Sequence, residues 1–199
     1  MLHGLIDFLF PPQCAACCAL GNGLCETCAP TAPLLHRRLP TLTVCALASY
    51  DGAARRAVLA LKDGRRDVGS ALGARLSEWI VAGTILVPVP TTRARRRTRG
   101  IDGVEVMARA AALHALARVA TVLEPIGTDA QRGRNRAERV AACGRFRCDA
   151  ALVRGRTVVL LDDVCTTGAT LEDCAAALRA AGATVVQAFV VALAQPDRD

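Results

Sequence analysis

The chain has 199 residues, of which 52% are hydrophobic, 22% charged and only 3% aromatic. This composition fits one domain of ordinary size with a small appended module, and it excludes a disordered tail protein. No run approaches the roughly 18 apolar residues that a membrane helix needs. Residues 1–10 contain no Lys or Arg and no small-residue cleavage site follows them, so they fail as a secretory signal. We therefore expect a soluble, cytoplasmic protein with no membrane insertion.

The formal net charge is +7, and Lys62 is the single lysine among 25 basic residues. A basic chain can bind nucleic acid, a membrane surface or a phosphorylated small molecule, and net charge alone does not choose among them. The chain also contains ten cysteines. Without an export signal they indicate metal binding or buried thiols, because a reducing cytosol does not maintain a disulfide framework.

Five of the ten cysteines are clustered between Cys14 and Cys28. Two CxxC pairs can close a tetrahedral four-thiolate Zn²⁺ site, which leaves no open position for water and so favours a structural role. A module this small cannot be held together by apolar burial alone, so we expect its folding to be coupled to the metal. Unliganded thiols in a reduced loop are the alternative. Cys18 is the spare cysteine, and His36 is a weaker substitute ligand. The predicted ligands are Cys14, Cys17, Cys25 and Cys28.

Residues 30–40 contain prolines and basic residues, which indicates an extended, solvated linker. We place a domain boundary near residue 40, so that residues 1–40 form the zinc knuckle and linker and residues 41–199 the main domain. Strands are expected over 41–50, 85–90, 121–124, 157–161 and 184–193, and helices over 53–62, 67–82, 104–119 and 170–181. Strands that alternate with helices predict an α/β fold with a parallel sheet flanked by helices.

The segment from Val158 to Thr170 carries the richest chemistry. An apolar strand runs into Asp162 and Asp163, and a turn rich in Thr and Gly then opens a helix. Ligands of open α/β sheets bind at this carboxyl end of the strands. Two carboxylates can accept hydrogen bonds from a vicinal diol, and the turn can bind a phosphate, where Gly168 allows close approach. A diol beside a phosphate describes a ribose 5-phosphate.

This segment has two other interpretations. A Walker B strand also runs from apolar into acidic residues, but it needs a Walker A loop. The only lysine is followed by Asp63, so no such loop exists and a P-loop NTPase is excluded. The other alternative is a turn that binds no phosphate, in which Asp162 and the threonines only cap the helix. Capping needs just one or two such residues.

The segment resembles the phosphoribosyl-pyrophosphate motif of type I phosphoribosyltransferases. Together with the four-cysteine knuckle, an ordered series of further motifs resembles the ComF family of competence-associated proteins over nearly the whole chain. These motifs are Tyr50-Asp51-Gly52, Leu61-Lys62-Asp63-Gly64, Val87-Pro88-Val89-Pro90 and Arg99-Gly100. The resemblance implies a type I phosphoribosyltransferase-like fold with a small N-terminal zinc knuckle.

The resemblance also implies roles for individual residues. Asp162 and Asp163 would hold the ribose hydroxyls and serve as the catalytic pair, and Mg²⁺ would bridge those hydroxyls and the pyrophosphate. The 5-phosphate would lie on Thr166, Thr167, Gly168, Ala169 and Thr170. The pyrophosphate would contact Lys62, Arg93, Arg97 and Arg99. For the arginines the alternative is a solvated basic turn or a nucleic-acid contact, and for the lysine a surface position.

Two further stretches of the chain bear on this resemblance, one as a possible closing loop and one as a departure from the family pattern. Residues 131–139 correspond to the flexible loop that closes over the site in type I enzymes, although their composition equally suits a disordered basic loop. Where ComF relatives have Arg-Gly-aromatic-Asn-Gln, this chain has Arg99-Gly100-Ile101-Asp102-Gly103. This departure puts the roles of the missing Asn and Gln in doubt.

Two functional hypotheses follow. The first is an enzyme that binds phosphoribosyl pyrophosphate with Mg²⁺, with an acceptor that the sequence does not specify. The second is a non-catalytic accessory module of DNA uptake or DNA processing on a transferase scaffold, with single-stranded DNA or proteins of the competence machinery as partners. The net charge and the knuckle favour the second hypothesis, while the scarcity of aromatic residues argues against stacking on DNA bases.

Overall fold

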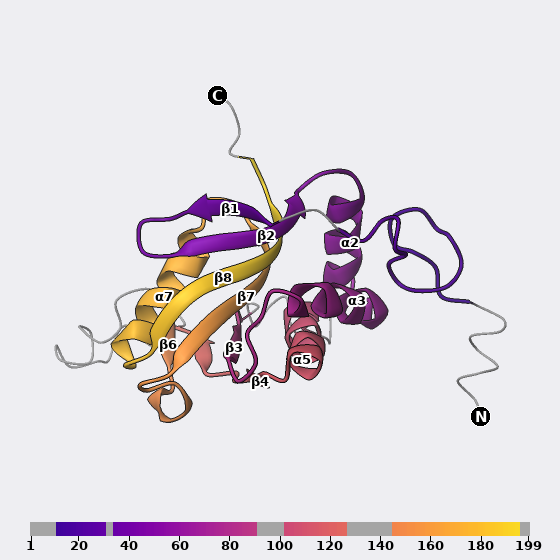
Figure 1. Ribbon diagram of the computed structural model, residues 1–199. Helices are drawn as coiled ribbons and strands as arrows, with labels where there is room; N and C mark the ends of the chain where they lie inside the picture. The colour runs from indigo at the N-terminus through magenta and orange to yellow at the C-terminus, as the bar shows by residue number, and fades with distance from the viewer. Residues whose placement is uncertain (1–10, 31–33, 91–101, 127–144, 196–199) are drawn as a thin grey trace.

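The computed structural model describes residues 11–30, 34–90, 102–126 and 145–195. Its centre is a six-stranded sheet in the order β1-β2-β8-β7-β3-β4, with helices packed on both faces (Figure 1). In this order, all neighbouring strands from β2 across to β4 pair in parallel, which confirms the predicted α/β sheet. Strand β1 joins β2 antiparallel. The strands are β1 (Leu35–Arg38), β2 (Thr43–Ser49), β3 (Ile85–Pro88), β4 (Arg118–Val119), β7 (Thr157–Cys165) and β8 (Thr184–Leu193).

The central strands are covered on both faces because their sequences are nearly continuous apolar runs. Helix α7 (Ala169–Ala180) packs on one face, and the other face is covered by α2 (Gly52–Lys62), α3 (Arg66–Ser77) and α5 (Gly103–Ala115). Alternate side chains of β7 divide between the two layers. Leu160 joins the layer of α7, and Leu161 joins the layer of α2, α3 and α5. We call the two ends of the parallel strands the carboxyl edge and the amino edge of the sheet.

Two glycines allow the helices of the second layer to approach closely. A Cβ at Gly73 of α3 would lie 2.3 Å from the carbonyl oxygen of Met107 in α5. A Cβ at Gly103 would lie 2.8 Å from the carbonyl oxygen of Leu61. The start of α5 therefore lies directly against the end of α2, which places Lys62 beside the carboxyl edge.

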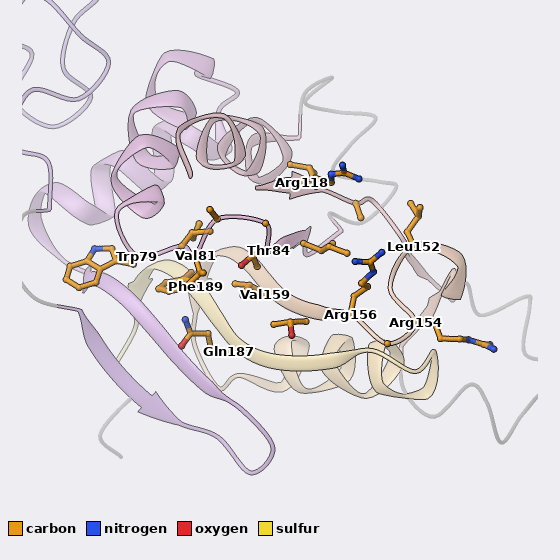
Figure 2. Close-up of a pocket in the computed structure, with 18 of the residues that line it drawn as sticks. Trp79, Val81, Thr84, Arg118, Leu152, Arg154, Arg156, Val159, Gln187 and Phe189 are labelled. Carbon is orange, nitrogen blue, oxygen red and sulfur yellow. The ribbon is translucent and has the colours of Figure 1, made fainter. Parts of the chain in front are cut away.

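Helix α3 is shorter than the predicted helix over 67–82. It ends at Ser77, and the N–H groups of Trp79 and Ile80 donate to carbonyl oxygens three residues back. Such tight turns are common at helix ends. The residues that follow, 79–83, leave the helix and line a cavity at the amino edge of the sheet (Figure 2).

Helix α5 also ends before the predicted position at residue 119. Leu116 has a left-handed backbone with φ of 54°, which closes the helix after Ala115. The next residues form the short strand β4 and pair with β3. Local composition, rich in Ala and Leu, favoured a longer helix, but pairing with the sheet prevailed. None of the helices among the described residues has both the length and the apolar character to cross a membrane.

The strand predicted over 121–124 does not join the main sheet. Its place is taken by β5 (Leu123–Pro125), which pairs antiparallel with β6 (Phe146–Cys148) in a separate two-stranded sheet. A short 3-10 helix, η2 (Ala150–Leu152), then leads into β7. Leu123 and Phe146 are buried in the same apolar layer as α7. The small sheet thus packs beside α7 and extends that layer.

The stretch predicted as a solvated linker is extended, as expected, but it is part of the sheet. Leu35–Arg38 forms the antiparallel edge strand β1, with His36 opposite Cys45. The main sheet therefore starts at Leu35, ahead of the predicted boundary near residue 40. Its sequence, with one apolar residue and three polar ones, carries no alternation that would have indicated a strand.

The cysteine-rich segment is anchored to the start of α3. Cys14 is buried in the apolar layer of α2, α3 and α5. Arg65 donates from Nη2 to the carbonyl oxygen of Gln13 at 2.6 Å, and its guanidinium also pairs with Asp67 at 2.5 Å. A Cβ at Gly23 would lie 2.5 Å from Oδ2 of Asp67. These contacts fix the segment against the main domain.

Candidate functional site

The motif residues surround a small hollow where β7 reaches the carboxyl edge. The hollow has a volume of about 40 Å³. It is lined by Asp162, Val164, Cys165, Thr166, Thr167, Gly168, Ala169, Thr170 and Leu171. Every residue predicted to hold the ribose 5-phosphate is in this lining except Asp163, whose side chain contacts Lys62. Residues read as one sequence motif therefore form one concave surface.

The turn into α7 depends on Gly168. Its φ of 86° belongs to the left-handed region, which glycine adopts without strain. The residue is buried, and a Cβ there would lie 2.5 Å from Cδ1 of Leu39. Thr167 Oγ1 accepts a hydrogen bond from the N–H of Ala169 at 3.4 Å. The other backbone N–H groups of the first turn belong to a helix N-terminus, which favours an anion.

The acidic pair is held by contacts from its own backbone and from α2. Asp162 Oδ1 accepts from the N–H of Asp163 at 2.8 Å, so this carboxylate does not cap the helix. Lys62 Nζ lies 3.4 Å from Asp163 Oδ2. The only lysine of the chain is therefore brought to the acidic pair, although more than 100 residues separate Lys62 and Asp163 in sequence.

Burial raises the pKa of Asp162 to about 8, and the neighbouring carboxylate of Asp163 contributes in the same direction. The N–H of Asp163 and the charge of Lys62 oppose the increase, while the charge of Asp102 adds to it. A carboxyl group with this pKa is largely protonated at neutral pH. The carboxyl group of Asp162 can therefore lose its proton when a cation binds.

Arg37 of β1 reaches the same edge of the sheet, a contact that sequence reasoning missed. Its Nη1 donates to the carbonyl oxygen of Thr166, and its Nη2 donates to the carbonyl oxygen of Ala194 at 2.5 Å. The guanidinium thus joins the phosphate-type turn to the end of β8. Its partners are more than 120 residues away in sequence, so no local pattern could have predicted the contact.

The residues after β1 hold the start of α7 from outside. The hydroxyl and the backbone N–H of Thr41 both donate to the carboxylate of Glu172, the N–H at 3.0 Å. Arg179 donates from Nη2 to the carbonyl oxygen of Thr41 at 2.6 Å. The side chain of Leu39 also lies close to Gly168. Together these contacts hold residues 37–41 against the turn and the helix that follows it.

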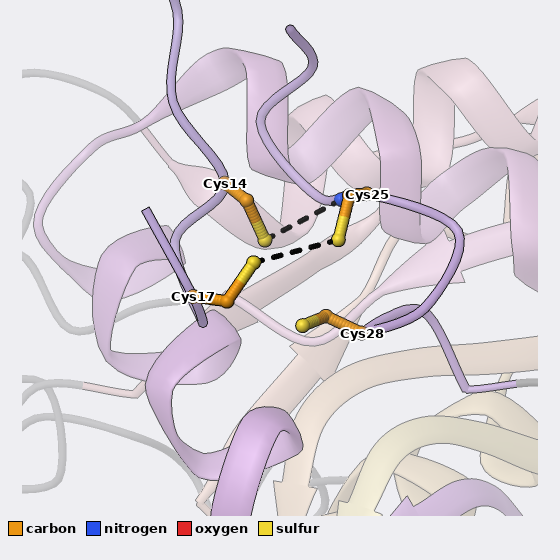
Figure 3. A group of neighbouring side chains, drawn as sticks. All are labelled: Cys14, Cys17, Cys25 and Cys28. Carbon is orange, nitrogen blue, oxygen red and sulfur yellow. Dashed lines mark hydrogen bonds between the residues drawn. The ribbon is translucent and has the colours of Figure 1, made fainter. Parts of the chain in front are cut away.

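The four predicted metal ligands converge in a second site. The Sγ atoms of Cys14, Cys17, Cys25 and Cys28 all lie within 4.8 Å of one another (Figure 3). Sulfurs bound to one tetrahedral zinc at about 2.3 Å lie about 3.8 Å apart. Cys17 Sγ and Cys25 Sγ are 3.6 Å apart, so the cluster could hold a metal ion. Cys18 lies outside the cluster, and His36 Nδ1 is instead 3.3 Å from Cys45 Sγ.

The cluster already favours a thiolate at one position. Burial alone would raise the pKa of Cys14, but hydrogen bonds from the N–H groups of Cys25 and Ala16, each 3.4 Å from its Sγ, and from Cys17 together lower that pKa to about 6. Hydrogen bonds with Cys17 and Cys25 raise the pKa of Cys28 to about 12. The backbone thus supplies N–H donors to the sulfur, as expected of a pocket for a thiolate ligand.

Several predicted residues lie outside the described part of the chain. Arg93, Arg97 and Arg99 belong to residues 91–101, and the possible closing loop 131–139 belongs to residues 127–144. Asp102, which begins the described chain after the first of these stretches, caps α5 by accepting from the N–H groups of Val104 and Glu105. The residue that departs from the ComF pattern therefore has a structural role at the start of a helix.

Comparison with known families gives the context for this geometry. The sequence profile of the phosphoribosyl transferase domain matches residues 84–198, more than half of the chain. The chain belongs to this family. The match covers the strands and the turn that form the hollow, so the phosphoribosyltransferase domain and the candidate site coincide. A search among curated proteins found no match.

Solved structures similar to this phosphoribosyltransferase domain include a glutamine phosphoribosylpyrophosphate amidotransferase from B. subtilis, complexed with ADP and GMP, at 23% identity and a TM-score of 0.46. That match covers 62% of this chain and 26% of the other, so this chain spans about a quarter of the length of that enzyme. A hypoxanthine phosphoribosyltransferase from Staphylococcus aureus is similar at 12% identity and a TM-score of 0.37, over 69% of this chain and 76% of the other.

Proposed function

We propose that this chain binds phosphoribosyl pyrophosphate with Mg²⁺ at the carboxyl edge and acts as a phosphoribosyltransferase. The observation that carries the proposal is the hollow at the end of β7. It brings an acidic side chain and the N-terminus of a helix together in a chain of the phosphoribosyl transferase family. A ribose 5-phosphate needs both an acceptor of hydrogen bonds from its diol and a donor set for its phosphate.

The proposed roles follow from the chemistry of each group. The backbone N–H groups and hydroxyls of residues 166–170 bind the 5-phosphate, and the dipole of α7 favours its charge. Asp162 and Asp163 accept hydrogen bonds from the ribose hydroxyls. Lys62, through its contact with Asp163, orients that carboxylate and adds positive charge on the side where the pyrophosphate binds. Arg93, Arg97 and Arg99 are proposed as further pyrophosphate ligands.

The acidic pair also fits a magnesium ion. Two adjacent carboxylates offer the oxygen ligands that Mg²⁺ prefers. Lys62 Nζ contacts this pair at Asp163 Oδ2, and Asp162, whose pKa is raised to about 8, can release its proton when the ion binds. When bound, the ion would neutralise charge on the leaving pyrophosphate. The pair would orient the sugar while the pyrophosphate leaves the anomeric carbon and a nucleophile of the acceptor forms the new bond to that carbon.

We further propose that the cysteine cluster holds structural Zn²⁺. The sulfur spacing and the N–H donors to Cys14 support a thiolate site. Docking on α3 through Arg65 supports a structural role, because the module covers part of the apolar layer. The combination of this module with the transferase motifs supports membership of the ComF family and a role in DNA uptake.

Calorimetric titration with phosphoribosyl pyrophosphate and Mg²⁺ tests the main proposal. We expect saturable binding that the Asp162→Asn, Asp163→Asn double variant weakens by about a hundredfold or more, because charged hydrogen-bond acceptors are lost. The matched control is Glu78→Gln with Glu124→Gln, which removes two exposed carboxylates elsewhere. Absence of binding by the folded wild-type protein, or equal weakening in both double variants, would overturn the proposal.

The zinc proposal is tested by metal content after purification. We expect one zinc per chain in the wild type and none in Cys14→Ser with Cys17→Ser. Cys18→Ser is the matched control, because Cys18 is exposed and lies outside the cluster. Full zinc content in the double variant would contradict the assignment of these ligands.

A further inference from the structure

A cavity of about 1110 Å³ opens at the amino edge of the sheet, on the side opposite the proposed active site (Figure 2). It is bordered by the turn after α3, by β4 and by the segment that leads into β7. The first residues of β3, β4 and β7 lie in its wall, whereas the hollow at Asp162 lies at the other end of β7. The volume is slightly above the range of roughly 300–1,000 Å³ that is typical of pockets for small ligands.

One end of this cavity is strongly cationic. Arg118, Arg154 and Arg156 line it, and no acidic residue is among the described residues of its wall. None of these three guanidinium groups has a hydrogen bond or an ion pair with a described residue. By contrast, Arg65 and Arg147 are paired with carboxylates. Unpaired arginines that line a concave surface provide charge and donors for an anion.

The backbone holds these arginines in fixed positions. The N–H of Gly155 donates to the carbonyl oxygen of Gly182 at 2.8 Å, and the carbonyl oxygen of Arg156 accepts from the N–H of Thr184 at 2.9 Å. The N–H of Arg118 donates to the carbonyl oxygen of Thr84 at 3.0 Å. The backbone segments that carry the arginines are therefore tied to the sheet, so binding of a ligand mainly requires ordering of the side chains.

The other end of the cavity is aromatic and apolar. Trp79 is 44% exposed and lies with Val81 and Phe189 away from the arginines (Figure 2). Gln187 lies on the floor near this end, with Oε1 3.8 Å from Cys45 Sγ, and its amide can also bond a ligand. An indole face suits stacking with a planar ring, and an amide suits the edge of a base. The wall thus changes from a surface for a planar group to a surface for phosphates.

We propose that this cavity binds a nucleoside phosphate, with the base toward Trp79 and the phosphates toward the arginines. The site is separate from the hollow at Asp162, so it is a second binding site and not the acceptor pocket of the transferase. Its occupancy does not depend on whether the carboxyl edge binds phosphoribosyl pyrophosphate.

Fluorescence provides a direct test, because Trp79 is the only tryptophan of the chain. ATP, AMP, inorganic triphosphate and a thymidine oligonucleotide are titrated against the full-length protein, with calorimetry as a second readout. We expect ATP to change the Trp79 emission in a saturable way and to bind more tightly than inorganic triphosphate. In Arg154→Gln with Arg156→Gln, we expect ATP binding to weaken about tenfold or more, because charge-assisted hydrogen bonds are lost.

Two controls separate this site from general effects. Arg55→Gln with Arg56→Gln removes the same charge from an exposed surface of α2 and should leave ATP binding unchanged. Asp162→Asn should also leave it unchanged, since that residue belongs to the opposite edge. Equal loss in both arginine pairs, binding of triphosphate as tight as ATP, or binding of the oligonucleotide alone would each overturn the proposal.

Discussion

The two edges of the sheet differ in charge, size and origin in the sequence. The carboxyl edge has a small hollow with an acidic pair, built from one continuous segment, residues 162–171. The amino edge has a large cavity with arginines and a tryptophan, which come from distant parts of the chain. One parallel sheet therefore presents two surfaces of different size and chemistry, about the length of β7 apart.

This difference shows how the same strands can serve two kinds of recognition. At the carboxyl edge, a turn leads directly into α7, so backbone N–H groups and neighbouring side chains are contiguous. At the amino edge, each strand enters from a different loop, and residues of several loops line the cavity. Substitutions at one edge should therefore leave the other edge unchanged, which makes each edge a control for the other.

The largest contrast is expected from glycine to alanine substitutions at the two edges. Gly168 and Gly155 both have positive φ, at 86° and 68°. A Cβ on Gly168 meets Leu39, whereas a Cβ on Gly155 meets nothing within 4 Å. We expect Gly155→Ala to lower the free energy of unfolding by about 1–2 kcal/mol through backbone strain. Gly168→Ala should cost about 1–3 kcal/mol more because of crowding, as measured by urea unfolding.

The control for this contrast is Leu39→Ala in the Gly168→Ala background. If the added cost comes from Leu39, the two substitutions should couple favourably in a double-mutant cycle. Gly168→Ala should also weaken binding of phosphoribosyl pyrophosphate and leave ATP binding at the amino edge unchanged. Equal destabilisation by the two glycine substitutions would show that crowding at Leu39 has no effect.

The contiguity of the carboxyl edge explains why sequence reasoning found it. Strand, acidic pair and turn follow one another from Val158 to Thr170, and each has a local signature. The four-cysteine cluster was predicted for the same reason, since two CxxC pairs lie within 15 residues. Lys62 was indicated by the resemblance to ComF proteins, and its contact with Asp163 depends on the close packing at Gly103.

The features that were missed depend on contacts between distant residues. The edge strand β1 has no apolar alternation, and it forms only because β2 offers an unpaired edge. The amino-edge cavity depends on the early ends of α3 and α5, where tertiary contacts override helix propensity. Residues 79 and 118 were both predicted to be helical, so their place in one cavity could not be foreseen.

The pH dependence of ligand binding should also separate the two edges. Below pH 8, Asp162 is mainly protonated in the free protein, because its pKa is raised to about 8. A bound magnesium ion favours the ionised carboxylate, so binding must release a proton. Affinity for phosphoribosyl pyrophosphate with Mg²⁺ should therefore rise by up to about tenfold per pH unit toward pH 8 and then level off.

Binding at the amino edge gives the comparison, because arginine is its only ionisable residue type among the described lining and remains charged throughout. Between pH 7 and 8, where the phosphates of ATP change little, its affinity should stay level. Calorimetry in two buffers with different ionisation enthalpies measures the proton release directly. An equal pH dependence at both edges would contradict the assignment to Asp162.

Ionisation of Asp162 should lower the free energy of unfolding as pH rises, whereas it raises the affinity for the ligand. An unfolded aspartate titrates near pH 4, whereas folded Asp162 titrates near pH 8. Between these values the folded protein binds more protons than the unfolded chain, so the free energy of unfolding falls as pH rises. We expect Asp162→Asn to flatten this decrease between pH 5 and 8, as measured by urea unfolding at several pH values. A slope unchanged by the substitution would assign the proton to another group.

The smallest expected effect concerns Arg37, which links β1 to the carboxyl edge. Arg37→Gln removes the donors to the carbonyl oxygens of Thr166 and Ala194, so the turn loses an outside support. Hydrogen bonds from a charged donor contribute about 1.5–3 kcal/mol each when buried, and less at a half-exposed position. We expect a loss of about 1 kcal/mol in unfolding free energy and a severalfold weaker affinity for phosphoribosyl pyrophosphate.

Arg38→Gln is the matched control for this support. Arg38 is the next residue of β1, it is exposed, and its side chain forms no hydrogen bond or ion pair with a described residue. The two variants have the same charge, so an effect of net charge on an anionic ligand would appear in both. A loss of affinity confined to Arg37→Gln, with ATP binding unchanged, would assign the effect to the support of the turn. Equal losses would leave Arg37 with no role beyond its charge.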